Sequence, residues 1–156
     1  MIRVHVPAGT TNLGAGFDCL GLALALLNTI AVEESDALRI ELPHEDQGRI
    51  PQDERNLVWQ AMVRTWEAAG VAARPVSIRQ VNRIPMTRGL GSSAASIVGG
   101  IVAADRLAAL RMSIEDKLDL AARLDGHPDN VAPALLGGLT AVALDGGRVR
   151  AARAMP

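Results

Sequence analysis

The stretch from Pro85 to Ser96, PMTRGLGSSAAS, constrains the fold more than any other part of the sequence, because it joins a glycine-rich turn to a long helical pattern. Gly89 and Gly91 can adopt positive φ angles and let the backbone approach a ligand closely. The apolar residues of 97–108 then recur at helical spacing. We expect the two serines after Gly91 to cap this helix. Free amides and the positive end of the helix dipole would then meet here, which favours a bound phosphate.

Other glycine-rich motifs fit this loop less well. A P-loop needs a lysine before its Ser or Thr, and here Gly91 precedes Ser92. Gly89, Gly91 and Ala94 match the alanine-ending dinucleotide pattern, but that pattern follows the first strand of a chain and needs an acid that ends the second strand. Glu115, at about the right distance, follows a helix cap instead. A dinucleotide-dependent dehydrogenase is therefore disfavoured, whereas a plain turn that starts a buried helix stays open.

Composition indicates one globular domain and excludes some partners. The chain has 156 residues, of which 49% are hydrophobic and 21% charged. The net charge of -1 gives no electrostatic attraction to nucleic acid or to an anionic membrane, and three aromatic residues cannot form a platform for stacked bases. We therefore expect a small-molecule partner, with no nucleic acid and no membrane.

Targeting signals are also lacking in the sequence. The longest apolar run, 20–27, is much too short to span a bilayer, and residues 1–7 have no apolar signal-peptide core. A single cysteine, Cys19, excludes an internal disulfide and suggests a reducing compartment. These features predict a cytoplasmic protein.

Hydrophobic periodicity predicts strands and helices in mixed order. Strands are expected over 2–6, 20–33 (one long strand or two), 38–42, 76–81 and 139–144, with loops over 8–18 and 43–55 and a hairpin turn at 145–147; helices are expected over 57–69, 94–108 and 113–124. Pro7 should end the first strand. Ser113 with Asp116 predicts a capping box, and Asn56 is either a helix N-cap or a site residue.

Two polar stretches are candidate sites. Residues 125–130, DGHPDN, place two carboxylates, an imidazole and an amide between a helix and the apolar run 133–138, which leads into the strand at 139. Such groups are costly beside a core unless they are used, although Asp and Asn also form caps and turns. In the loop over 8–18, Asn12 and Asp18 are able to line a polar pocket, and a plain connector is the alternative.

Three stretches together resemble the small-metabolite kinases that phosphorylate galactose, homoserine, mevalonate and phosphomevalonate. Residues 7–18 (PAGTTNLGAGFD) resemble the first family motif, and residues 85–96 resemble the second, phosphate-binding motif. Residues 126–134 (GHPDNVAPA) are similar to a segment of the members that act on homoserine. The likeness covers nearly the whole chain and keeps the order and spacing of the motifs.

The resemblance implies an α+β fold like the second domain of a small-subunit ribosomal protein, in which a mixed sheet is backed by helices. A left-handed crossover would surround the phosphate loop. Residues 1–156 would be an N-terminal ATP-binding kinase domain, because the family adds a C-terminal domain with a third glycine-rich motif and arginines for the substrate carboxylate. We therefore expect a fragment of a longer protein or the product of a truncated gene.

The resemblance also implies the chemistry: ATP and Mg²⁺ as cofactors, and L-homoserine as the substrate whose terminal hydroxyl accepts the γ-phosphoryl group, a step of threonine biosynthesis. It leaves a homodimer open. Ser93 and Asp125 would be the catalytic, Mg²⁺-binding pair, and Asn12, Asp18 and His127 would face homoserine. The ATP-binding residues would be Asn56 near the adenine and, around the phosphates, Pro85, Met86, Thr87, Arg88, Gly89, Leu90, Gly91, Ser92, Ser93, Ala94 and Ala95.

Asp125 departs from the family, which usually has a Glu at this position, so the carboxylate is one methylene shorter. The sequence also lacks the Lys and Asp pair of mevalonate kinases, which leaves deprotonation to the substrate phosphate or water. Phosphoryl transfer needs mainly positioning and charge neutralisation. A catalytically inactive nucleotide-binding module and a kinase for a related metabolite remain the alternatives.

Overall fold

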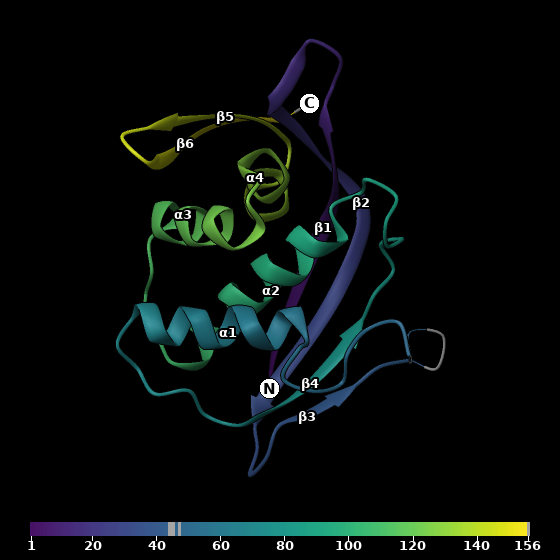
Figure 1. Cartoon of the computed structure of the whole chain (residues 1–156), viewed down its shortest axis with the longest axis vertical. Coiled ribbons are helices and arrows are strands. Elements are labelled where there is room, and N and C mark those ends of the chain that lie inside the picture. The colour runs from purple at the N-terminus through teal and green to yellow at the C-terminus, as the bar shows by residue number, and fades with distance from the viewer. Residues whose placement is uncertain (44–45, 47, 156) are drawn as a thin grey trace.

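The computed structural model describes residues 1–43, 46 and 48–155. Its strands form one mixed sheet, and its helices gather on one side of that sheet (Figure 1). This arrangement confirms the expected mixed sheet backed by helices. The strands are β1 (Ile2–Asn12), β2 (Gly16–Glu34), β3 (Arg39–Glu41), β4 (Val76–Val81), β5 (Leu139–Asp145) and β6 (Arg148–Ala154), and the helices are α1 (Leu57–Ala68), α2 (Ser92–Leu107), α3 (Ile114–Asp125) and α4 (Pro128–Leu136).

The long strand β2 organises the sheet, whose order is β3-β4-β2-β5-β6 with β1 also paired to β2. The half of β2 over 29–34 pairs with β4, and residues 20–22 pair with β5, both antiparallel. β3 runs parallel to β4, whereas β5 and β6 form an antiparallel hairpin. The apolar run predicted as one strand or two is therefore a single strand that serves two parts of the sheet.

The first strand is longer than the sequence indicates. Pro7 does not end it, and most of the predicted loop over 8–18 lies in β1 and β2. The expectation of a loop was wrong because the pairing of β1 with β2 shifts register between Pro7 and Ala8, as in a β-bulge. The extra residues, Ala25 and Leu26, lie in β2, so the pairing is interrupted next to Pro7, which cannot donate a ladder hydrogen bond.

Local signals placed the other early elements correctly. The strand over 76–81 is β4, and the helix over 57–69 is α1 with Asn56 as its N-cap. Ser113 caps α3, where its hydroxyl oxygen accepts a hydrogen bond from the Asp116 amide at 3.0 Å. The predicted loop over 43–55 contains no α-helix or extended strand among its described residues, which include a 3-10 turn position at Asp46 and an isolated bridge at Ile50; residues 44, 45 and 47 lie outside them.

The segment after the polar stretch is a helix that the sequence analysis missed. Residues 133–138 were expected to lead into a strand, but Pro133 lies inside α4 and Gly137 is its C-cap. Pro128 occupies the first helical position, where the missing amide costs nothing. The sequence analysis missed this helix because it is only 9 residues long and has a second proline, Pro133, inside it.

Helix α2 is at the centre of the core, where it packs against β1, β2 and the other three helices, and α4 also packs on the sheet. In Figure 1, α2 lies between α1 and the sheet. Its close approach to α1 requires glycine, since a Cβ at Gly100 would lie 2.5 Å from the Val58 carbonyl oxygen. The neighbouring Trp66 side chain is fully buried and donates its indole N–H to the Ala104 carbonyl at 3.3 Å. This packing fixes the axis of α2, and with it the direction in which its N-terminus points. Among the described residues, no helix is long and apolar enough to cross a membrane.

Candidate functional site

The N-terminus of α2 is open, an arrangement that favours a bound anion. The N-cap is Gly91, with φ 69°, so the prediction that Ser92 and Ser93 would cap the helix was wrong: both lie in its first turn. Gly91 adopts a left-handed conformation that L side chains rarely take, and it has no side chain to bond the helix amides. No side chain of the described residues caps this end. The first amides of α2 therefore stay available to a ligand, together with the positive end of the dipole.

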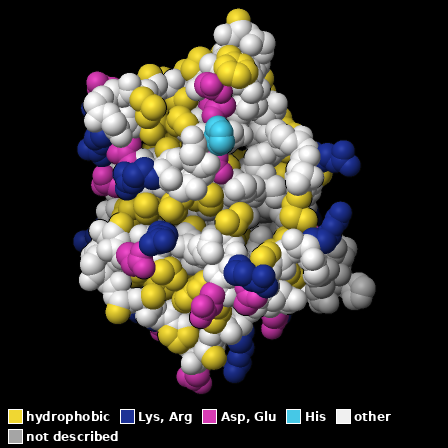
Figure 2. Space-filling view, viewed as in Figure 1, with side chains coloured by type: hydrophobic (Ala, Val, Ile, Leu, Met, Phe, Trp, Pro, Cys, Tyr) yellow, Lys and Arg dark blue, Asp and Glu magenta, His cyan; other side chains and the backbone are white. Residues whose placement is uncertain are grey.

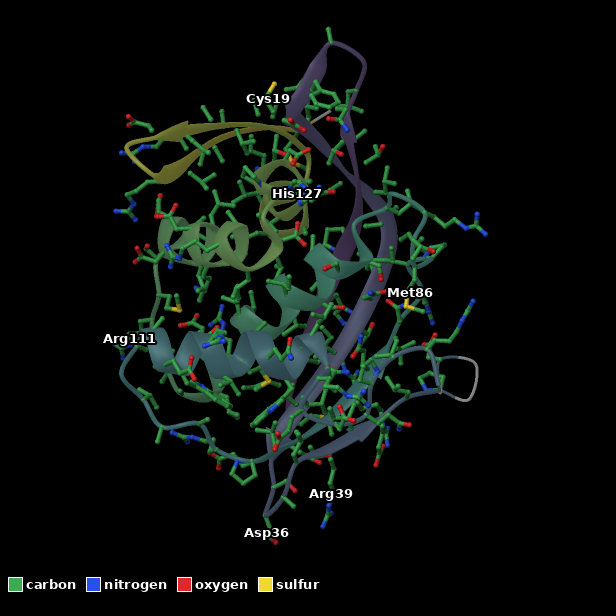
Figure 3. All side chains as sticks on the ribbon, in the orientation of Figure 1. Cys19, Asp36, Arg39, Met86, Arg111 and His127 are labelled. Carbon is green, nitrogen blue, oxygen red and sulfur yellow. The ribbon has the colours of Figure 1, made fainter. Side chains whose placement is uncertain are left out.

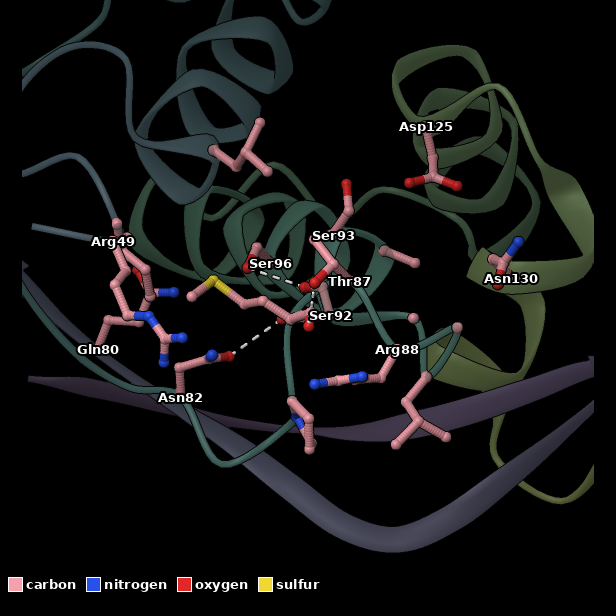
Figure 4. A pocket seen from close by; sticks show the side chains of 18 of the residues that line it. Arg49, Gln80, Asn82, Thr87, Arg88, Ser92, Ser93, Ser96, Asp125 and Asn130 are labelled. Carbon is pink, nitrogen blue, oxygen red and sulfur yellow. Dashed lines mark hydrogen bonds between the residues drawn. The ribbon is translucent and has the colours of Figure 1, made fainter. Parts of the chain in front are cut away.

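A network of asparagine side chains holds the loop that leads into α2. Asn28 of β2 is fully buried, and its side-chain oxygen accepts hydrogen bonds from the Arg83 and Ile84 amides at 2.8 and 3.0 Å. Its side-chain nitrogen donates to the Asn82 side-chain oxygen, which also accepts a hydrogen bond from the Ser92 hydroxyl at 3.2 Å (Figure 4). The sheet therefore positions the start of the helix directly.

The open helix end faces a cavity of about 580 Å³. Met86 lies on one side of it and His127 on another (Figure 3). Asp125 and Asn130 lie at one end of the cavity, called the polar end below, and Arg49 and Gln80 lie at the other (Figure 4). The lining residues are Arg49, Ile50, Pro51, Asn56, Leu57, Gln80, Asn82, all of Pro85 to Ala94, Ser96, Asp125, His127 and Asn130. The lining therefore combines apolar side chains, the open end of α2 and the Asp125 carboxylate.

Ser93 and Asp125 face each other across the polar end, from the first turn of α2 and the end of α3 (Figure 4). The Asp125 side chain is only 9% exposed. Burial raises the pKa of Asp125, and repulsion from Asp129 adds to this rise, whereas a hydrogen bond with Ser93 and the nearby His127 oppose it. A cation at this carboxylate would offset the cost of its buried charge.

The Ser93 and Asp125 pair suits Mg²⁺ as two ligands among several. Mg²⁺ prefers oxygen ligands, and it usually takes one or two carboxylates and completes its shell with phosphate oxygens and water. Among the described residues, no cluster of three His, Cys, Asp or Glu side chains could hold a metal by itself. The residues therefore fit a metal that arrives with a phosphate ligand, and they do not fit a metal held by protein alone.

A second, smaller cavity of about 300 Å³ adjoins the first at His127, which lines both. Asp18 from the start of β2 and Asp129 from α4 also line it. Figure 2 shows a histidine with acidic side chains above and below it, at the position that Figure 3 labels His127. The second cavity is acidic and would suit a cationic group of a ligand.

Most of the predicted site residues line one of the two cavities, but some of them only support a neighbouring residue or pack in the core. Asn12 does not line either cavity; its side-chain oxygen accepts a hydrogen bond from the Asp18 amide at 2.9 Å, where Asp18 has a φ of 55°. Asn56 lines the first cavity but is fully buried in its capping role. Ala95 does not line the cavity, because its side chain is buried in the core and its amide donates to the Gly91 carbonyl at 2.9 Å.

Several lining residues were missed by the sequence analysis. Asn130 lies inside the polar stretch but had no separate role, and Arg49 lies in a loop with no motif. Gln80 had a readable signal: Val76, Ile78 and Gln80 are the inward positions of β4, and the third of them is polar. A polar side chain at an inward position of a strand indicates that this part of the strand faces a cavity and not the apolar core.

Comparison with known proteins supports the kinase resemblance over the whole chain. A family model described as "GHMP kinases N terminal domain" matches residues 56–138. The homoserine kinase of Desulfitobacterium hafniense is 53% identical over 140 residues, which cover 90% of this chain and 47% of that protein. The homoserine kinase of Petrotoga mobilis is 52% identical over 141 residues, with coverage of 90% and 46%. The chain thus spans about half the length of the curated relatives it matches.

Solved structures share the fold. A structure from Listeria monocytogenes, described as a candidate homoserine kinase, is 42% identical with a TM-score of 0.87, and the match covers 98% of this chain and 53% of the other. The Methanococcus jannaschii mevalonate kinase, at 16% identity and a TM-score of 0.76 over 96% and 55% of the two chains, shows likeness of fold alone. This chain therefore belongs to the GHMP kinase family, the small-metabolite kinases that its three motifs resemble.

Proposed function

We propose that this chain is the N-terminal, ATP-binding and homoserine-binding part of a cytoplasmic homoserine kinase. The activity is transfer of the γ-phosphoryl group of ATP to the terminal hydroxyl of L-homoserine. One observation carries the proposal: the cavity at the open end of α2 and the acidic cavity beside Asp18 meet at His127. A phosphate donor in the first cavity and an amino-bearing acceptor in the second would therefore meet at a shared wall.

The first cavity would bind and orient the nucleotide. Amides at the start of α2 would hold phosphate oxygens, while Arg49 and Arg88, which line the same cavity, would add positive charge. Bound Mg²⁺ would neutralise charge that develops on the transferred group. The Ser93 hydroxyl and the Asp125 carboxylate would hold that ion at the polar end, and the base would lie at the other end, beside Gln80.

The second cavity would orient the acceptor. Asp18 would pair with the ammonium group of homoserine, and Asn12 would keep Asp18 in place through its hydrogen bond to the Asp18 amide. His127 would lie between the acceptor and the phosphates. As the new O–P bond forms and the bond to ADP breaks, the hydroxyl proton would pass to a phosphate oxygen or to water.

Nucleotide binding by residues 1–156 tests the proposal. We expect Mg²⁺-ATP to slow hydrogen exchange of the Ser92, Ser93 and Ala94 amides, because these amides are open at the end of α2. Gly91→Val should weaken ATP binding by roughly 10–100-fold, since holding a β-branched residue at a positive φ costs about 1–3 kcal/mol. The nearest neighbours of a Cβ there would be Gly9 N at 3.6 Å and Asn130 Oδ1 and Gly9 O at 3.9 Å, which are ordinary contacts, so the effect comes from backbone strain. Exchange that ATP leaves unchanged in the parent chain would contradict the proposal.

The metal pair gives a second prediction. Ser93→Ala should raise the Mg²⁺ concentration needed for half-maximal ATP binding roughly tenfold, as expected for one lost contact to a charged group. Metal-free nucleotide binding should change less. Ser96→Ala is the matched control, because the Ser96 hydroxyl is already bonded to the Ser92 carbonyl at 3.1 Å.

Asp125→Glu tests the same pair from the other side. It should keep or improve Mg²⁺-dependent binding, because the longer side chain restores the reach of the carboxylate that the family usually has. Titration of ATP at several Mg²⁺ concentrations measures both variants. Complete loss of binding in Asp125→Glu, or equal effects of Ser93→Ala with and without Mg²⁺, would assign these residues a structural role alone.

A further inference from the structure

Gln80 is a buried polar residue on the wall of the first cavity. It is the last inward-facing residue of β4, it is 2% exposed, and it lies at the end of the cavity away from Asp125 (Figure 4). A primary amide at such a position costs free energy unless its groups are bonded. The orientation of this amide therefore decides whether Gln80 presents a hydrogen-bond donor or an acceptor to a ligand in the cavity.

The cap of α1 fixes that orientation. The Asn56 side-chain oxygen accepts hydrogen bonds from the Val58 and Trp59 amides at 2.9 and 3.3 Å. These two amides can only donate, so the side-chain nitrogen of Asn56 must point the other way. It donates to the Pro51 carbonyl at 2.9 Å and to Gln80 Oε1 at 3.3 Å. Because Asn56 must donate to Gln80, the Gln80 oxygen faces Asn56 and its Nε2 faces away.

Nε2 of Gln80 is therefore a free donor at the cavity wall. Among the described residues, no side-chain nitrogen or oxygen that is fully shielded from solvent lacks a hydrogen-bond partner. No partner for Gln80 Nε2 is found in that part of the chain, so this atom is not fully shielded and opens to the cavity. Figure 4 shows Gln80 on the same side of the cavity as Arg49 and Asn82.

We propose that Gln80 determines the choice of nucleobase, by donating a hydrogen bond from Nε2 to N1 of adenine. This inference rests on the proposed nucleotide site. With phosphates at the start of α2, the base would lie against the apolar side chains Ile50, Leu57 and Met86, which line the same cavity as Gln80, and its edge would meet Gln80. Adenine N1 accepts a hydrogen bond, whereas guanine N1 carries a hydrogen. With guanine in the same position, Gln80 Nε2–H and guanine N1–H would face each other as two donors, and both would be left without a hydrogen bond.

Gln80→Glu is the sharpest test, because it keeps an oxygen for Asn56 and replaces only the donor with an acceptor. We expect ATP binding to weaken roughly tenfold, and the preference for ATP over GTP to shrink or reverse, since a single hydrogen bond is exchanged. Gln60→Glu makes the same chemical change at an exposed position of α1 and should leave both affinities unchanged. Calorimetric titration of ATP and GTP into the parent chain and both variants measures the ratio.

A test on the parent chain does not depend on a variant that folds. The triphosphate of 1-deazaadenosine, which lacks the N1 acceptor, should bind roughly tenfold more weakly than ATP. An unchanged ATP to GTP ratio in Gln80→Glu, or equal binding of ATP and the 1-deaza analogue, would overturn the role of Gln80. Failure of the parent chain to bind any of the nucleotides would instead overturn the proposed function, so the two failures are distinguishable.

Discussion

Lys117→Met is expected to lower the free energy of unfolding by about 3–5 kcal/mol, because it removes one partner of a buried ion pair. Lys117 Nζ lies 2.8 Å from Asp105 Oδ2, and the two side chains are only 12% and 6% exposed. The same ammonium group donates to the Met112 carbonyl at 2.8 Å, and the Met112 amide donates to Asp105 Oδ1 at 2.9 Å. Methionine keeps most of the volume but leaves the Asp105 carboxylate buried without a countercharge.

The pH dependence separates this cause from a packing defect. In the parent chain burial opposes ionisation of Asp105, but hydrogen bonds from Lys117 and the Met112 amide hold its pKa below the usual 3.8. That pair contributes stability above the usual pKa and loses it as pH falls through the lowered one. In Lys117→Met burial would raise the pKa instead, so the variant should regain stability as pH falls from 7 toward 5.

Urea unfolding followed by circular dichroism at pH 7 and pH 5 measures both effects. The double variant Asp105→Leu with Lys117→Met is the control, because it removes both charges and should lie closer to the parent chain than the single variant does. A loss below about 1 kcal/mol for Lys117→Met, with the same pH profile as the parent chain, would contradict the prediction.

The ion pair keeps Lys117 away from the candidate site. Lys117 is the only lysine in the sequence, and its contact with Asp105 links α3 to the end of α2. Within this chain, charge neutralisation of a bound triphosphate would therefore fall to backbone amides, arginine side chains and a metal ion. Arg49 and Arg88 are the arginines that line the cavity.

Local signals explain which parts of the fold could be predicted. The alternation over 76–81 gives β4 with its bounds, because one face of that strand is buried and the other is exposed. The capping residues Asn56 and Ser113 start their helices where expected, because a cap is a contact between near neighbours in sequence. The glycine-rich turn before α2 was predicted for the same reason, because Gly89 and Gly91 determine the local backbone.

Non-local contacts explain most of what could not be predicted. Pro7 stays within β1 because the partner strand absorbs a bulge, and that partner lies 20 residues along the chain. The Asn28 and Asn82 contact that places the helix start joins residues 54 apart in sequence. Asn12 and Asp18 were predicted as substrate residues, but only the turn geometry reveals that one supports the other. The meeting of two cavities at His127 likewise depends on tertiary structure.

Residues 1–156 alone are expected to show negligible homoserine-dependent ADP release, although they should bind ATP. Alignment of reacting groups contributes roughly 7–11 kcal/mol to reactions of this kind in favourable cases. The acidic cavity offers Asp18 to the ammonium group of homoserine, but among its described lining residues there is no lysine or arginine for the carboxylate. One end of the acceptor would be held, and the hydroxyl would not stay in line with the γ-phosphorus.

The measurement is a coupled assay of ADP release with and without homoserine. It compares this chain with a chimera in which the second half of the Desulfitobacterium hafniense homoserine kinase follows residue 156, since that relative is 53% identical over the shared part. The chimera should gain homoserine-dependent turnover, and Asp18→Asn in the chimera should raise the KM for homoserine while ATP binding is kept. Turnover by residues 1–156 at the rate of the chimera would contradict the prediction. Such turnover would show that Asp18 and His127, supported by Asn12, suffice to align homoserine without a cationic partner for its carboxylate.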